Sequence, residues 1–103
     1  MINVVHKHSG KTGEYIGRPS PLGNPFVIGR DGTRDDVIRK YRDWLDAEIA
    51  KDFGGDWPAT RVQDEYQRLL MIAESGDLTL VCWCAPKACH GDVIRELIEG
   101  DLT

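Results

Sequence analysis

The sequence predicts a small α/β domain, arranged as a three-layer sandwich with a short, mostly parallel sheet, about three helices and an ordered loop rich in glycine and proline. Two observations lead to this fold class. Strand-like apolar segments alternate with segments of helical apolar spacing, as in parallel sheets; the strand-like segments are 2–8 and 78–84, and the helical ones are 31–55, 57–76 and 89–100. The chain has 103 residues and no linker or repeat, so we expect a single domain spanning residues 1–103.

The strand-like segments differ in their expected burial. The opening segment, INVVHKH, is rich in β-branched residues, and an extended backbone would direct His6 and His8 to the same face. The later segment, LTLVCWC, is apolar on both faces, which is typical of a central strand covered on both sides. EYIG and PFVIG are expected to form two further short strands, one on either side of the loop.

Capping residues and glycines predict where the helices begin and end. Thr33 with Asp36, and Thr60 with Gln63, have the spacing of a capping box, in which two side chains satisfy each other's free backbone N–H groups. Glycines are expected to end the three helices, at Gly54-Gly55, Gly76 and Gly100.

The segment YIGRPSPLGNPFVIG, residues 15–29, carries the strongest functional signal. Its three prolines restrict the unfolded chain, and long loops in compact domains are often binding elements. Arg18 can hold a phosphate or carboxylate through two hydrogen bonds, and Ser20 and Asn24 are its expected partners in ligand binding. The alternative is a loop that covers a sheet edge, with Arg18 paired to a carboxylate.

The segment CWCAPKACHG, residues 82–91, is the second candidate for chemistry. Cys89 precedes a helix, and a helix N-terminus lowers the pKa of a thiol, so Cys89 is a candidate nucleophile. His90 or Asp92 would serve as the acid or base, and the backbone around Gly91 would add free N–H groups for an anion. The alternative is that these cysteines are small, unreactive core residues.

A zinc site is the other interpretation of the same segment. Cys82, Cys84, Cys89 and His90 are four sulfur or imidazole groups within nine residues. Structural zinc sites favour ligands separated by at least two residues, and neither the Cys-x-Cys pair nor the adjacent Cys-His pair has that spacing. We therefore expect no bound metal and no cofactor.

The loop and the cysteine segment together resemble the family catalogued as domain of unknown function 4326, small proteins found in bacteria and their phages. Its glycine-arginine-proline-serine and asparagine-proline-phenylalanine steps are matched by Gly17 to Ser20 and by Asn24 to Phe26. Its cysteine segment is matched by Cys82, Cys84, Pro86, Cys89, His90, Gly91 and Asp92. The resemblance covers most of the chain and fails mainly over residues 46–68. It implies no known activity, but it supports treating the two segments as one unit.

The charge distribution narrows the class of partner. The net charge is −4, which argues against non-specific binding to nucleic acid. Residues 1–30 nevertheless carry four Lys or Arg and one Glu, a charge of +3, so the remainder carries −7. An anionic small molecule or a single nucleotide fits this asymmetry better than a long nucleic acid.

Three functions fit these residues. The first is a small domain that binds an anionic, nucleotide-like ligand at the carboxyl ends of the strands, where it could also modify a nucleotide or nucleic acid. The second is a non-catalytic phage or bacterial protein that binds a host or partner protein, and the third is a zinc-stabilised module. The sequence shows no signal peptide or membrane span and an odd number of cysteines, so we expect a cytoplasmic protein, in the host cytoplasm if a phage encodes it.

Overall fold

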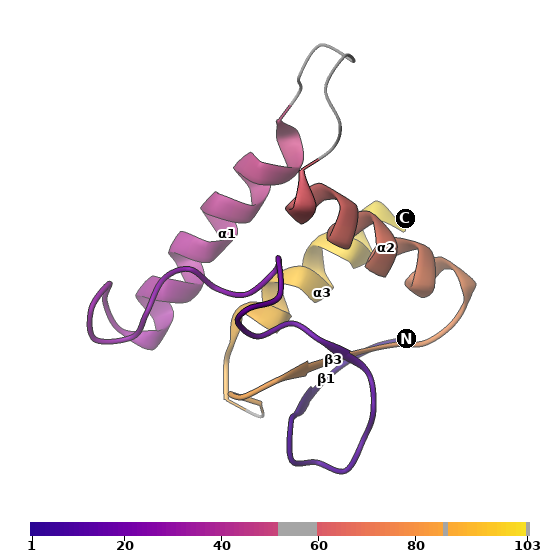
Figure 1. Cartoon of the computed structure of the whole chain (residues 1–103), viewed down its shortest axis with the longest axis horizontal. Helices are drawn as coiled ribbons and strands as arrows, with labels where there is room; N and C mark the ends of the chain where they lie inside the picture. Colours follow the sequence, from indigo (N-terminus) through magenta and orange to yellow (C-terminus); the bar gives the residue numbers. More distant parts are fainter. Residues whose placement is uncertain (52–59, 86, 103) are drawn as a thin grey trace.

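The computed structural model describes residues 1–51, 60–85 and 87–102, and these form a parallel sheet and three helices (Figure 1). The elements, in chain order, are β1 (Ile2–His6), β2 (Glu14–Tyr15), α1 (Arg34–Ala50), α2 (Arg61–Ser75), β3 (Leu78–Cys82) and α3 (His90–Asp101). Strand β3 lies between β1 and β2 and is parallel to both. The α/β class, the short parallel sheet, the three helices and the central position of the second apolar strand are confirmed.

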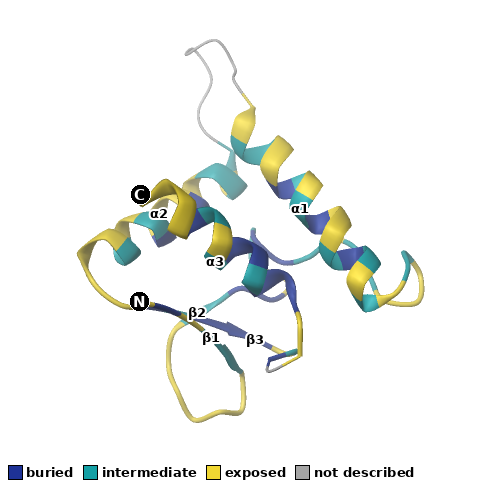
Figure 2. Cartoon of the chain, turned by 180° about the vertical axis from the view of Figure 1, so that it is seen from behind, coloured by how far each residue is buried: buried dark blue, intermediate teal, exposed yellow. Residues whose placement is uncertain are grey.

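All three helices lie on the same side of the sheet (Figures 1 and 2). Helix α1 contacts both α2 and α3, and α3 contacts β1 and β3. One apolar cluster joins them to a single face of the sheet; from the strands it includes Ile2, Leu78, Leu80 and Cys82. The described residues thus form one helical layer on one sheet, not the expected three-layer sandwich, because the helices bury their apolar sides against each other as well as against that face.

A capping box begins each helix. The Thr33 hydroxyl accepts from the Asp36 N–H at 3.3 Å, and the Asp36 carboxylate accepts from the Thr33 N–H at 3.0 Å. Thr60 and Gln63 repeat this arrangement at α2, as predicted. The Gln63 side-chain amide also donates to the backbone carbonyls at the end of α1, which joins the two helices.

The predicted helix ends are confirmed in one case and corrected in another. Helix α2 is followed by Gly76 as its C-cap. Helix α3 continues through Gly100 to Asp101, so the prediction that Gly100 ends it is wrong; a glycine inside a helix costs only about 1 kcal/mol relative to alanine. The expected end of the first helix at Gly54-Gly55 lies outside the described residues.

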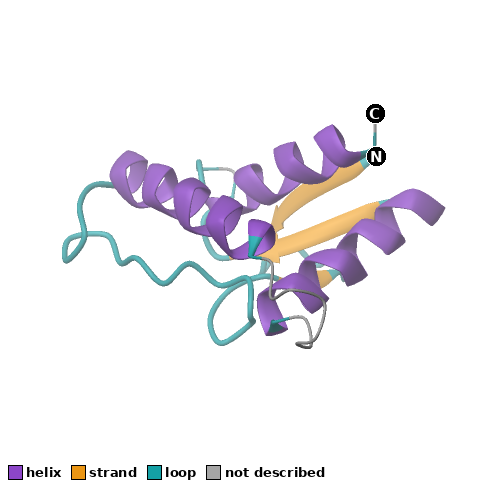
Figure 3. Ribbon diagram, turned by 90° about the horizontal axis from the view of Figure 1, so that it is seen from above, coloured by secondary structure: helices purple, strands orange, loops and turns teal. Residues whose placement is uncertain are grey.

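The connection between β2 and α1 extends beyond the sheet to reach the start of α1 (Figure 3). Its PFVIG stretch is not a strand, contrary to the prediction. The Val27 N–H donates to the Asp31 carboxylate and the Asp31 N–H donates to the Val27 carbonyl, both at 2.8 Å, so these backbone groups are used in a local turn. Gly29 and Gly32, with φ of 94° and 131°, supply the left-handed conformations that this turn requires.

Leu22 and Tyr41 hold the connection against α1. Both are completely buried, and the Tyr41 hydroxyl donates a 2.7 Å hydrogen bond to the Leu22 carbonyl. Burial raises the pKa of Tyr41, which therefore stays protonated and acts as the donor. None of the described helices is long and apolar enough to cross a membrane.

Candidate functional site

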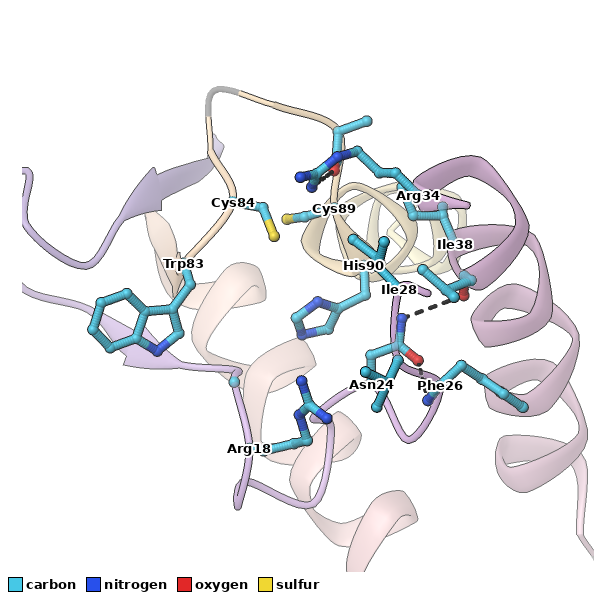
Figure 4. A pocket seen from close by; sticks show the side chains of 14 residues that line it. Arg18, Asn24, Phe26, Ile28, Arg34, Ile38, Trp83, Cys84, Cys89 and His90 are labelled. Carbon is cyan, nitrogen blue, oxygen red and sulfur yellow. Dashed lines mark hydrogen bonds between the residues drawn. The ribbon is translucent and has the colours of Figure 1, made fainter. Parts of the chain in front are cut away.

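A pocket of about 240 Å³ lies where the loop of residues 17–28 meets the start of α1 and the β3–α3 junction (Figure 4). Fourteen residues line it. Of those that the sequence singled out, Arg18, Asn24, Cys84, Cys89 and His90 are among them. The loop and the cysteine segment therefore share one site, as expected for a unit at the carboxyl end of a parallel strand.

His90, the first residue of α3, forms the floor between the two segments. Its Nε2 atom lies 2.7 Å from the Ile16 carbonyl oxygen, and its ring packs edge-on against Tyr41. Burial is the main cause that lowers the pKa of His90, and the nearby Arg18 guanidinium lowers it further. The imidazole is therefore neutral near pH 7 and donates its Nε2 proton to the loop backbone.

Arg18 lies at the mouth of the pocket, and its side chain points toward the His90 ring (Figure 4). Its guanidinium makes no hydrogen bond or ion pair with any residue that the structure describes. Its backbone carbonyl, by contrast, accepts a 3.1 Å hydrogen bond from the Tyr15 hydroxyl. The alternative in which Arg18 pairs with a carboxylate is therefore not seen among the described residues. The Arg18 backbone is anchored, whereas its guanidinium is available to a ligand.

Gly17 and Gly23 in the loop have a structural role. A Cβ on Gly17 would lie 2.3 Å from the Tyr15 hydroxyl, and one on Gly23 would lie 3.0 Å from the backbone of Arg18. Any side chain at these positions would push Tyr15 or Arg18 out of place. The glycines thus allow the loop to pack closely on its own residues and so set the position of Arg18.

Asn24 and Ser20 have structural partners. The Asn24 amide nitrogen donates to the Val37 carbonyl on α1 at 3.3 Å, and its oxygen accepts from the Phe26 N–H at 2.9 Å. Asn24 therefore fixes the loop on α1, although it also lines the pocket. Ser20 accepts from the Leu22 N–H at 3.3 Å and does not line the pocket, so the structure does not group it with the other predicted ligand-binding residues.

Cys89 is held inside the protein by Cys82. The two Sγ atoms lie 3.2 Å apart, and Cys89 also accepts from the Gly91 N–H. Its hydrogen bond to Cys82, together with burial, raises the pKa of Cys89, whereas that bond lowers the pKa of Cys82. The expectation that the helix N-terminus lowers the pKa of Cys89 is therefore wrong, because the neighbouring sulfur and burial outweigh the helix.

Asp92 and Gly91 complete the cap of α3 and do not line the pocket. The Asp92 carboxylate accepts from the Cys89 N–H at 3.1 Å, which closes the capping box, and lies 3.9 Å from Arg95. Gly91 is buried so closely that an added Cβ would lie 2.9 Å from both Ile16 and Val4. Of the three predicted catalytic residues, the structure therefore brings only Cys89 and His90 to the pocket.

The four residues considered as zinc ligands do not converge. Within residues 1–51, 60–85 and 87–102, no three His, Cys, Asp or Glu side chains are arranged to hold a metal ion. Cys82 and Cys89 face each other, Cys84 lines the pocket and the His90 Nε2 atom faces the Ile16 carbonyl.

Arg34 and Trp83 are the main residues that sequence reasoning missed. Arg34, the first residue of α1, lines the pocket opposite Arg18 and donates a 3.1 Å hydrogen bond to the Ala88 carbonyl. Trp83 follows β3, lines the pocket and remains 51% exposed. The available signals were an arginine next to a predicted N-cap and a tryptophan at a strand end; neither is specific.

No Asp or Glu occurs among the fourteen lining residues, so the pocket is electropositive.

Comparison with known proteins places the chain in a family. A search of curated proteins and a search of solved structures gave no match. The family model described as Domain of unknown function (DUF4326) matches residues 2–100, which includes the stretch 46–68 where the sequence resemblance was weakest. The match covers nearly the whole chain, and the protein therefore belongs to the DUF4326 family.

Proposed function

We propose that the pocket binds an anionic, nucleotide-like small molecule. The observation that carries this proposal is the Arg18 guanidinium, which lies at the pocket mouth without a partner among the described residues. An arginine in this position can receive a phosphate or carboxylate through two parallel hydrogen bonds. Arg34 provides a second guanidinium on the opposite wall, and among the described residues its side chain donates one hydrogen bond, to the Ala88 carbonyl.

The remaining walls suit an apolar or aromatic group. Phe26, Val27, Ile28, Ile38 and Trp83 line the same pocket. Ligand sites typically combine such walls with a few fixed polar groups, as here. The volume of about 240 Å³ lies below the range of about 300–1,000 Å³ that is usual for drug-sized ligands. A single nucleotide, or part of one, is therefore the class of ligand we propose.

Binding rather than catalysis is the better-supported form of this proposal. The candidate nucleophile Cys89 is buried, has a raised pKa and contacts Cys82. The candidate acid–base group Asp92 caps a helix outside the pocket. His90 is held by the Ile16 carbonyl, where it supports the loop that carries Arg18. We nevertheless keep modification of a nucleotide as the reaction class to test if turnover is found.

Thermal unfolding tests the proposal directly. The wild type is heated with and without a panel of nucleoside mono-, di- and triphosphates, sugar phosphates and uncharged nucleosides. A true ligand at about one hundred times its Kd should stabilise the fold by about 2.7 kcal/mol. We expect phosphorylated members to stabilise the protein, and we expect nucleosides without phosphate to have a much smaller effect.

Two arginine variants test whether a stabilising ligand binds in this pocket. Arg18→Ala should fold normally and lose about 1.5–3 kcal/mol of binding free energy, as for a charge-assisted hydrogen bond. Arg39→Ala is the matched control, because Arg39 is an exposed residue of α1 whose 3.1 Å ion pair with Asp36 lies outside the pocket. A wild type that no panel member stabilises, or equal losses in the two variants, would contradict the proposed site.

Binding of a partner protein is the second candidate function, and one observation favours it. Ile28 and Trp83 are 49% and 51% exposed at the pocket, and exposed apolar side chains are common where proteins dock. In that case Ile28→Ser should abolish capture of the partner, whereas Arg18→Ala should leave that capture unchanged. Three free cysteines support a reducing, cytoplasmic location, and the family resemblance supports a bacterial or phage origin.

A further inference from the structure

A partly exposed group of aromatic and basic side chains surrounds Trp83 at the end of the sheet. We call it the Trp83 cluster; its members are His6, Lys7, His8, Tyr15 and Trp83. The Lys7 ammonium lies 4.6 Å from the centre of the Trp83 ring and 5.1 Å from that of Tyr15. The rings of His6 and His8 pack edge-on to Trp83, with centroids 6.0 Å and 5.2 Å away.

The five cluster residues are not members of the apolar core, and none of them pairs with a carboxylate among the residues that the structure describes. Trp83 is half exposed, and neither Lys7 nor His8 is buried. No hydrogen bond or ion pair joins an Asp or Glu side chain to any of the five cluster residues within the described part of the chain. Lys7 thus holds a positive charge beside aromatic surface, a combination that stabilises single-stranded nucleic acids by base stacking and phosphate contact.

The cluster and the pocket form one continuous site. Trp83 belongs to both, since it also lines the pocket. The Trp83 indole N–H donates to the Tyr15 hydroxyl at 2.8 Å, and this hydroxyl donates in turn to the Arg18 carbonyl at 3.1 Å. This chain of hydrogen bonds sets the tryptophan beside the residue whose guanidinium lies at the pocket mouth.

We propose that the natural ligand is a short stretch of single-stranded nucleic acid, with one nucleotide in the pocket and the adjacent base stacked on Trp83. Lys7 and Arg18 would hold the phosphates on either side. This inference rests on the proposed nucleotide pocket and extends it to a polymer. Residues 1–30, which include Lys7 and Arg18, carry +3 against −7 over the remainder, so we expect a binding footprint only a few nucleotides long.

The test compares ligands of increasing length. Fluorescence anisotropy of labelled oligonucleotides, from one nucleotide to about six, is measured with the full chain in competition with unlabelled mononucleotides. A second stacked base should improve affinity by about tenfold. Lys7→Ala and Trp83→Ala should remove this gain, and Lys7→Ala should leave mononucleotide affinity intact because Lys7 does not line the pocket. Lys40→Ala on α1, whose ammonium donates a hydrogen bond to the Asp31 carbonyl, is the control and should behave as wild type.

The outcomes separate this inference from the proposed function. Equal affinity for mononucleotides and oligonucleotides, unchanged in Lys7→Ala, would overturn the inference and leave the nucleotide pocket standing. Equally tight binding of a duplex, or of a glutamate-rich peptide that depends on Trp83 and Lys7, would also overturn it. Oligonucleotide binding that requires Trp83 and Lys7 but is indifferent to Arg18→Ala would support the cluster and contradict the pocket. Absence of binding by every nucleotide ligand would overturn both.

Discussion

The His90 Nε2 atom lies 2.7 Å from the carbonyl oxygen of Ile16, across 74 positions of the chain. A carbonyl oxygen can only accept, so the imidazole must carry its proton on Nε2. The bond ties the first residue of α3 to the residue that precedes Gly17 and Arg18. The position of the loop arginine therefore depends on a neutral histidine in the other segment.

Stability should depend on pH through His90. Burial lowers its folded-state pKa below the usual value of about 6.5, so the unfolded chain binds the proton more readily than the folded one. The free energy of unfolding should therefore fall as pH drops below about 6.5, by at most about 1.4 kcal/mol per pH unit. Asp31 and Asp36, whose pKa values are lowered from 3.8, titrate below this window and do not contribute.

The measurement is urea unfolding at about pH 7.5 and about pH 5.5 for the wild type and His90→Gln. The variant removes the titrating group and should show the smaller difference between the two conditions. His8→Gln, at an exposed position, should retain the pH dependence of the wild type. An identical dependence in His90→Gln and wild type would contradict the assignment.

Asn24→Ala should destabilise the protein. The change removes the hydrogen bond to Val37, which joins the loop to α1, and the bond to Phe26 within the loop, and should cost about 1–3 kcal/mol because both hydrogen bonds are part-buried. Asn3→Ala, at an exposed position of β1, is the matched control and should change the unfolding free energy by less than about 0.5 kcal/mol. Equal stability of the two variants would show that Asn24 does not anchor the loop.

Asp92→Ala distinguishes a helix cap from a catalytic carboxylate. Loss of the capping box with Cys89 should lower the unfolding free energy by about 0.5–2 kcal/mol, and the affinity of the pocket for its ligand should change little. Asp64→Ala, in the first turn of α2 but outside its capping box, serves as the comparison in urea unfolding. A variant as stable as wild type that loses all turnover on a nucleotide substrate would instead support the catalytic role.

Alkylation should select Cys84 among the three thiols. Cys82 and Cys89 are buried and contact each other, whereas Cys84 is partly exposed and lines the pocket. Brief treatment of the native protein with iodoacetamide should give one modification per chain, found by peptide mass spectrometry at Cys84 and absent in Cys84→Ser. Rapid modification of Cys82 would show that its lowered pKa outweighs its burial.

Those parts of the fold that depend on near neighbours were predictable from the sequence. Thr33 with Asp36, and Thr60 with Gln63, form the expected capping boxes because the two members lie three residues apart and meet in any first helical turn. The apolar strand 78–82 was predicted as central because both of its faces are apolar. The lining of one pocket by Arg18 and His90 followed from parallel strands, whose carboxyl ends lie at the same edge of the sheet.

The tertiary structure alone decided the features that depend on distant contacts. All helices lie on one side of the sheet because they share a single apolar cluster, which periodicity cannot assign to a face. A hydrogen bond to the Ala88 carbonyl, 54 positions away, holds the Arg34 side chain at the pocket, and no sequence spacing predicts that contact. The pKa of Cys89 is raised because Cys82, seven positions earlier, meets it at 3.2 Å once strand and helix pack together. The starts of the first two helices and the central strand were thus determined by local sequence, whereas the side of the sheet that the helices cover and the raised pKa of Cys89 were set by long-range packing.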